Sequence, residues 1–122
     1  MILNNFRTIA CNETKILSTI HVNECFRIGI DLKNNSADTI TIRSSGSLGV
    51  IFDKSENIKL VGLISHMPFN IKILSGASIP AITSNGYKID RAQSLKALLT
   101  ITVVTHSGDV KKFSKSFVID IV

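Results

Sequence analysis

The sequence predicts an all-β domain, an antiparallel β-sandwich of about seven to nine short strands. Hydrophobic residues make up 44% of the 122 residues, with no Trp and a single Tyr. Most of them are Ile, Val and Leu, and β-branched side chains suit a pleated sheet better than a helix. Several segments also alternate apolar and polar residues between polar turns. One domain covering residues 1–122 accommodates all of these segments.

The clearest predicted strand is Glu24–Leu32, in which every second residue is a large apolar one. Such a period of two is typical of a half-buried strand. An Asn-rich turn follows, and Thr39–Arg43 then alternates again. Further strands are expected at 50–52, 58–64, 69–73, 79–83 and 87–89, with weaker ones at 6–11 and 15–22. Pro80 lies within one of these segments and predicts an edge strand, because proline cannot donate to a sheet ladder.

Two short hairpins are expected in the middle of the chain. One joins Val50–Phe52 to Ile58–Ile64 across a polar turn. The other is indicated by Asn85-Gly86, a two-residue hairpin signal between Ile79–Thr83 and Tyr87–Ile89.

A longer hairpin is expected at the C-terminus, where Leu98–Thr105 turns back through Ser107-Gly108-Asp109 into Val110–Val122. It is the strongest long-range prediction of the sequence. Just before it, Asp90-Arg91-Ala92-Gln93 resembles a helix capping box and predicts one helical turn within Asp90–Leu99.

The C-terminal hairpin departs from the rule that one face of a sheet is polar. If Leu99, Ile101 and Val103 face the core, together with Phe117, Ile119 and Ile121, several apolar neighbours face outward. These form a candidate interface with a protein partner or a second copy of the chain: Leu98, Val104, Val118 and Val122. The alternative is that scattered surface valines are ordinary, or that a loop covers them.

The chain is basic, with 14 Lys and Arg against 9 Asp and Glu and a net charge of +5. The only local cluster is Lys111, Lys112 and Lys115, a candidate anion-binding site; the alternative is an ordinary solvated strand. No aromatic residues are interleaved with these lysines to stack on bases, so nucleic acid is not expected as a partner.

Motifs with a defined catalytic or cofactor chemistry are absent from the sequence. His21, His66 and His106 lie far apart and have no closely spaced partner ligands, so no metal site is expected. The sequence therefore predicts no cofactor and no enzyme activity. No apolar run is long enough to cross a bilayer, and no membrane span is expected.

Cys11 and Cys25 are the only cysteines. They permit one disulfide if the protein is exported. The N-terminus does not read as a secretory signal, so we expect two free thiols in a cytoplasmic protein or an assembled particle. An exported fragment is the alternative, and the glycosylation patterns that begin at Asn12 and Asn34 are compatible with it.

The segment Ile20–Ser36 resembles the second strand of immunoglobulin-like accessory modules, and Tyr87–Val104 resembles a later stretch of the same modules. This resemblance implies an immunoglobulin-like antiparallel β-sandwich. Within that group, Asn35–Val61 is similar to the intracellular proteinase inhibitor domains of bacilli, although the aromatic residues of that family are missing. The order of Gly49–Asp53, Ile79-Pro80 and Gly86-Tyr87 is similar to the C-terminal glycan-recognition domains of O-antigen ABC transporters.

Three functions follow from these observations. The first is a non-catalytic interaction or assembly module: a structural subunit, an adaptor or a particle-surface protein. The second is a carbohydrate-binding accessory domain, which the glycan-recognition resemblance implies and the scarcity of aromatic residues disfavours. The third is a protease-inhibitor-like module.

Overall fold

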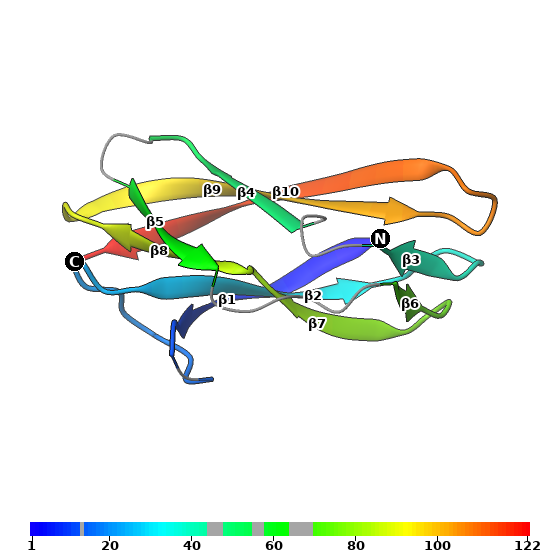
Figure 1. Cartoon of the computed structure of the whole chain (residues 1–122), viewed down its shortest axis with the longest axis horizontal. Helices are drawn as coiled ribbons and strands as arrows, with labels where there is room; N and C mark the ends of the chain where they lie inside the picture. Colours follow the sequence, from blue (N-terminus) through cyan, green and yellow to red (C-terminus); the bar gives the residue numbers. More distant parts are fainter. Residues whose placement is uncertain (13, 44–47, 55–57, 64–69) are drawn as a thin grey trace.

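The computed structural model describes residues 1–12, 14–43, 48–54, 58–63 and 70–122. These residues form ten β-strands in two antiparallel sheets, with no helix among them (Figure 1). The all-β prediction is therefore confirmed. The first sheet has the order β1 (Ile2–Ala10), β2 (Phe26–Lys33), β8 (Asn85–Ile89) and β5 (Ile58–Leu63), and β7 (Ser78–Ile82) also pairs with β2. The second has the order β10 (Val110–Ile121), β9 (Gln93–Val104), β3 (Ile40–Ile42) and β6 (Ile71–Ile73), and β4 (Leu48–Phe52) also pairs with β9.

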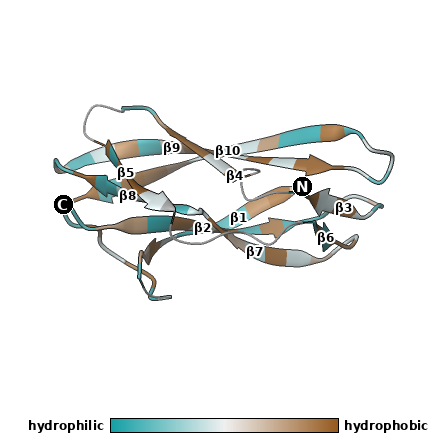
Figure 2. Cartoon of the chain, viewed as in Figure 1, coloured by the Kyte–Doolittle hydropathy of each residue, from teal (hydrophilic) through white to brown (hydrophobic). Residues whose placement is uncertain are grey.

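The two sheets enclose one hydrophobic core. Alternate residues of β9 are almost completely buried, and so are the inward residues of β2. Figure 2 shows hydrophobic and hydrophilic residues interspersed along β9 and β10. Phe52 of β4 meets Tyr87 of β8 edge to face, with 5.2 Å between ring centroids, and Tyr87 also lies beside Phe26 of β2. These aromatic contacts join the sheets across the core.

The C-terminal hairpin forms as predicted. β9 and β10 pair continuously from Val104↔Val110 to Gln93↔Ile121. The helical turn expected within Asp90–Leu99 is wrong, because β9 begins at Gln93. Leu95, Ala97 and Leu99 follow the period of a strand and are all buried, so burial against the core outweighs the local capping signal.

The two short hairpins predicted in the middle of the chain are wrong. β4 pairs with β9 in one sheet, whereas β5 pairs with β8 in the other. The second predicted hairpin is instead two consecutive strands: β7 and then β8 pair with β2, both antiparallel to it, and β8 pairs with β5 on its other side. The alternation of apolar and polar residues indicates which face of each strand is buried, but it does not indicate which strand pairs with it.

Thr83 explains the break between β7 and β8. Its backbone N–H donates to the Ile28 carbonyl (2.8 Å), while its Oγ1 accepts the Ile28 N–H (3.1 Å). The Thr83 hydroxyl thus accepts the Ile28 N–H in place of a backbone carbonyl. The chain can therefore bulge between β7 and β8 while both backbone groups of Ile28 stay hydrogen-bonded. Pro80 of β7 pairs with Asp31 on one side only among the described residues, which confirms the edge position predicted for it.

The hydrogen bonds of Asn34 connect the turn after β2 to the loop before β7. Its side chain is 1% exposed. Its Nδ2 donates to the carbonyls of Asp38 (2.7 Å) and Ile73 (2.9 Å), and its Oδ1 accepts the Ser36 N–H (3.0 Å) and hydroxyl (2.6 Å). Its backbone pairs with Ala77 and Gly76. In the folded protein both hydrogens of the Asn34 Nδ2 are used in these bonds, so this nitrogen is not accessible for glycosylation.

Candidate binding surface

Three large apolar side chains lie side by side on the outer face of the second sheet. Leu98 of β9 stands opposite Ile51 of β4 on one side and Ser116 of β10 on the other. Val118 of β10 is opposite Lys96, one diagonal step from Leu98. Ile51, Leu98 and Val118 are 66%, 36% and 64% exposed. We call these three residues the outer apolar patch.

The other two predicted interface residues lie away from this patch. Val104 is half-buried and pairs with Val110 at the far end of the hairpin, about 20 Å along β9 from Leu98. Val122 lies beyond β10, where its N–H donates to the Ile20 carbonyl (2.9 Å) and its carbonyl accepts the Val22 N–H (3.0 Å). The last residue is therefore ordered by its own chain. Sequence reasoning missed Ile51, because its position depends on the unexpected pairing of β4 with β9.

The three predicted anion-binding lysines share strand β10 but not one face. Lys112 lies on the outer side of the strand, while Lys111 and Lys115 have the parity of the core-facing residues. Lys115 Nζ donates to the Leu3 carbonyl (3.2 Å) and lies 5.5 Å from the centre of the Phe117 ring. The lysines therefore line an edge and do not converge on a single anion.

The side of β10 that faces away from β9 is a free edge from Val110 to Val118. The Thr105 N–H donates to the Asp109 carbonyl (2.8 Å), so Thr105 and Asp109 are a hydrogen-bonded pair in the β9–β10 register. Such pairs recur at every second residue of an antiparallel ladder, so the odd-numbered residues of β10 are the ones whose backbone groups bond to β9. The even residues direct their N–H and C=O groups outward, and Val122 uses its own to bind Ile20. Nothing in the described part of the chain pairs with this side before the Ile20–Ile121 bridge.

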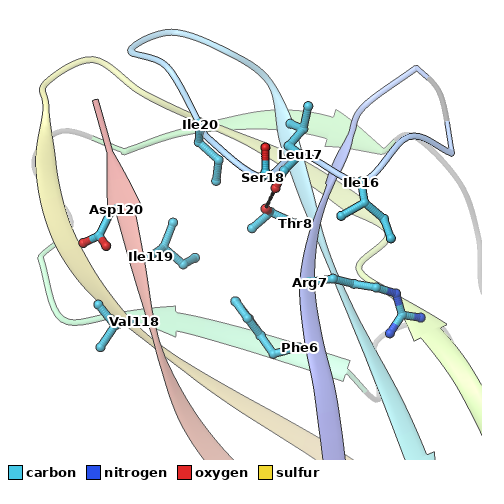
Figure 3. Close-up of a pocket in the computed structure, with 10 residues that line it drawn as sticks. All are labelled: Phe6, Arg7, Thr8, Ile16, Leu17, Ser18, Ile20, Val118, Ile119 and Asp120. Carbon is cyan, nitrogen blue, oxygen red and sulfur yellow. Dashed lines mark hydrogen bonds between the residues drawn. The ribbon is translucent and has the colours of Figure 1, made fainter.

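Two grooves run beside the free edge, between β10 and β1. One, of about 310 Å³, lies between Phe6, the 16–20 segment and Ile119 (Figure 3). In Figure 3 Phe6, Ile20 and Ile119 point into this space, while Val118 and Asp120 point to the other side of β10. The second groove, of about 280 Å³, lies between the start of β1 and Phe113. The stacked rings of Phe6 and Phe117, with centroids 4.3 Å apart, join β1 to β10 along this same edge.

A disulfide between Cys11 and Cys25 anchors the segment that borders the larger groove. The free thiols predicted from the sequence are therefore wrong. β1 and β2 pair up to Ala10↔Phe26, and Cys11 and Cys25 are the next pair in that register, with Cα atoms 5.5 Å apart. That geometry suits a disulfide, but it becomes visible only once the β1–β2 pairing is known.

The segment enclosed by the disulfide adds to the edge of β1. The Leu17 N–H donates to the Thr8 carbonyl (2.8 Å), and Thr8 Oγ1 donates to the Leu17 carbonyl (2.8 Å). Ile16 bridges Ile9 in the same ladder. These bonds hold Ile16 and Leu17 at the rim of the larger groove, which Ile20 also lines.

Ionisable groups elsewhere form structural contacts. Arg7 forms an ion pair with Asp31 (3.2 Å), and Asn5 Nδ2 donates to the same carboxylate (2.7 Å). Burial lowers the pKa of Arg27, whose Nε donates to the Thr83 carbonyl (3.0 Å). Burial raises the pKa of Tyr87, in keeping with its place in the core.

No group of His, Cys, Asp and Glu within the described ranges could hold a metal ion. His21 and His106 are exposed, and His66 falls outside the described residues. No helix of the described residues is long and apolar enough to cross a membrane.

No protein-family model matches the sequence, and no curated protein matches it.

Proposed function

We propose that this chain is a non-catalytic protein-binding module of the immunoglobulin-like sandwich type, which serves as a subunit, adaptor or surface protein of a larger assembly. The outer apolar patch is the observation that supports this function most strongly. Burying a large aliphatic side chain contributes about 1.5–3 kcal/mol, so three adjacent ones give a useful contact. Ile51, Leu98 and Val118 lie on three neighbouring strands and so offer one continuous contact instead of isolated apolar residues.

The surroundings of the patch also suit a protein interface. Thr100, Ser114 and Ser116 lie next to it on the same face, and Lys96 lies opposite Val118. Protein interfaces commonly have an apolar centre and a polar rim. The Thr100 and Ser114 hydroxyls bond to each other (2.9 Å), so these two groups of the rim are satisfied within the chain.

A carbohydrate-binding role has less support. Such sites usually present an exposed aromatic ring to the sugar, whereas none of the aromatic side chains that the structure describes is exposed. The region that resembles a proteinase inhibitor, Asn35–Val61, lies partly outside the described residues.

The disulfide supports a location in an oxidising environment, since structural disulfides persist in exported and surface proteins and are rare in a reducing cytosol. We therefore favour an exported or particle-surface setting over a cytoplasmic one.

The Ile51→Lys/Leu98→Lys double variant tests the proposed function, because it adds two charges to the patch and leaves β10 intact. Partner capture from the native host, followed by affinity measurement, should show at least tenfold weaker binding, which is about 1.4 kcal/mol. Size exclusion with light scattering should show the same loss if the partner is a second copy.

The matched control is Leu60→Lys/Leu74→Lys, since these residues are 61% and 64% exposed and lie elsewhere. Circular dichroism should show that both variants fold. Equal partner binding by the two variants would contradict the assignment of the interface to the patch.

A further inference from the structure

The free edge of β10 offers an unused row of backbone hydrogen-bonding groups. Five residues, Val110, Lys112, Ser114, Ser116 and Val118, direct their N–H and C=O groups away from β9. An exposed strand edge is a template for pairing with another extended chain. This edge spans nine residues, or about 30 Å, which is long enough to hold a complete added strand.

We propose that the free edge of β10 binds an extended, acidic segment of the partner protein, which adds to the second sheet as a further strand. This inference rests on the proposed protein-binding function and specifies the chemistry of the partner.

Charge along the edge favours an acidic partner. Lys111, Lys112 and Lys115 all lie on the free edge, and Val110–Val118 contains no Asp or Glu. Lys112 lies toward the outer face, where an outward carboxylate of an added strand would find it nearby, and the other two lie toward the inner side, where they add to the positive charge of the edge. The chain as a whole carries a net charge of +5, which adds a long-range attraction.

The same charges disfavour a second copy of this chain as the occupant. Pairing two β10 edges would bring six lysines together with no acid between Val110 and Val118 of either copy. Edge lysines are a recurrent device against such self-pairing. A partner strand of opposite charge turns this repulsion into attraction.

The grooves supply apolar contacts on the inner side of the edge. Every second side chain of an added strand would point toward β1. There it would meet the two hollows beside the Phe6–Phe117 stack, one lined by Ile119 and Leu17 and the other by Phe113. The expected partner segment therefore alternates apolar residues, which enter the grooves, with acidic ones, which face outward.

A synthetic peptide tests the proposal without knowledge of the native partner. We expect a fluorescent, end-capped nine-residue peptide of alternating Val and Glu to bind saturably in a polarisation assay, and more weakly as salt is raised. The same peptide with alternate backbone nitrogens methylated should not bind, because it cannot pair with the edge. A peptide of alternating Val and Lys should not bind either.

Ser116→Pro is the decisive variant. The Ser116 N–H faces the free edge and not β9, so proline there keeps the β9–β10 ladder and removes one outward donor. We expect at least tenfold weaker peptide binding, while Ser116→Ala stays within about twofold of the wild type. Lys111→Glu/Lys112→Glu should also weaken binding at least tenfold, and Lys59→Glu/Lys72→Glu, with the same net charge, should weaken it much less.

Absence of binding to the wild type, or equal binding by Ser116→Pro and Ser116→Ala when circular dichroism shows both folded, would overturn the proposal. If the peptide fails but native-partner binding is lost in Ile51→Lys/Leu98→Lys, the edge proposal falls and the protein-binding function stands. If Ile51→Lys/Leu98→Lys keeps its partner while the peptide binds the wild type and not Ser116→Pro, the patch is wrong and the edge proposal stands.

Discussion

Replacing Asn34 by Ala should lower the free energy of unfolding by about 3 kcal/mol. The substitution removes the donor that serves the carbonyls of Asp38 and Ile73 and the acceptor that serves Ser36. A buried polar group left without a partner costs about 1–3 kcal/mol, and these groups lie where two loops meet. Urea unfolding followed by circular dichroism measures the loss. Asn35→Ala is the control, since Asn35 is exposed and adjacent.

Asn34→Asp adds a pH-dependent test of the same contacts. A carboxylate at this position would face two carbonyl oxygens, so the fold should favour its protonated form and raise its pKa above the unfolded value of about 3.9. The variant should therefore be destabilised most at neutral pH, and the deficit should shrink as pH falls through the raised pKa. Asn35→Asp should lack this dependence. An Asn34→Ala variant as stable as Asn35→Ala would show that these hydrogen bonds contribute little.

Reduction of the Cys11–Cys25 disulfide should lower the melting temperature by about 10 °C. The cysteines are 14 positions apart, and closing a loop of that size stabilises a fold by about 3 kcal/mol in the chain-entropy model. For a domain of this length, 1 kcal/mol corresponds to roughly 4 °C. Differential scanning calorimetry with and without dithiothreitol measures the shift, and thiol titration of the unfolded protein counts free cysteines.

The Cys11→Ser/Cys25→Ser variant is the control for this measurement. It should melt near the reduced wild type and respond to reductant no further. Reduction should also weaken binding of the Val and Glu peptide, because the disulfide anchors the segment that carries Ile16, Leu17 and Ile20 at the groove. An untreated wild type with two titratable thiols would show that the pair is not formed.

The sequence predicts which side of a strand is buried, because apolar residues alternate with polar ones along it. Leu99, Ile101 and Val103 were placed inward by parity and are buried, while Val118 was placed outward and is exposed. Strand partners could not be predicted in the same way. Asn85-Gly86 reads as a hairpin signal, yet β8 begins at Asn85, and the break before it depends on Thr83 bonding to the distant Ile28.

The candidate surface could be predicted only where it lies on one hairpin. Leu98 and Val118 come from β9 and β10, which are consecutive strands of a predicted hairpin. The sequence therefore predicts that these two side chains lie close together. Ile51 completes the patch from β4, and the disulfide depends on the β1–β2 register. Both are long-range pairings that leave no local signal. The free edge itself was not predicted, because it depends on what the rest of the chain leaves unpaired.

Backbone amide exchange along β10, measured by NMR in the free protein and in its complex with the native partner, tests the binding mode most directly. In the free protein the amides of Lys112, Ser114 and Ser116 should exchange rapidly, while those of Phe113, Lys115 and Phe117, which bond to β9, should exchange slowly. On partner binding, the first three amides should become protected. If they stay fast in a saturated complex, and the outer apolar patch shows no change either, the partner binds elsewhere and this side of the second sheet is not its site.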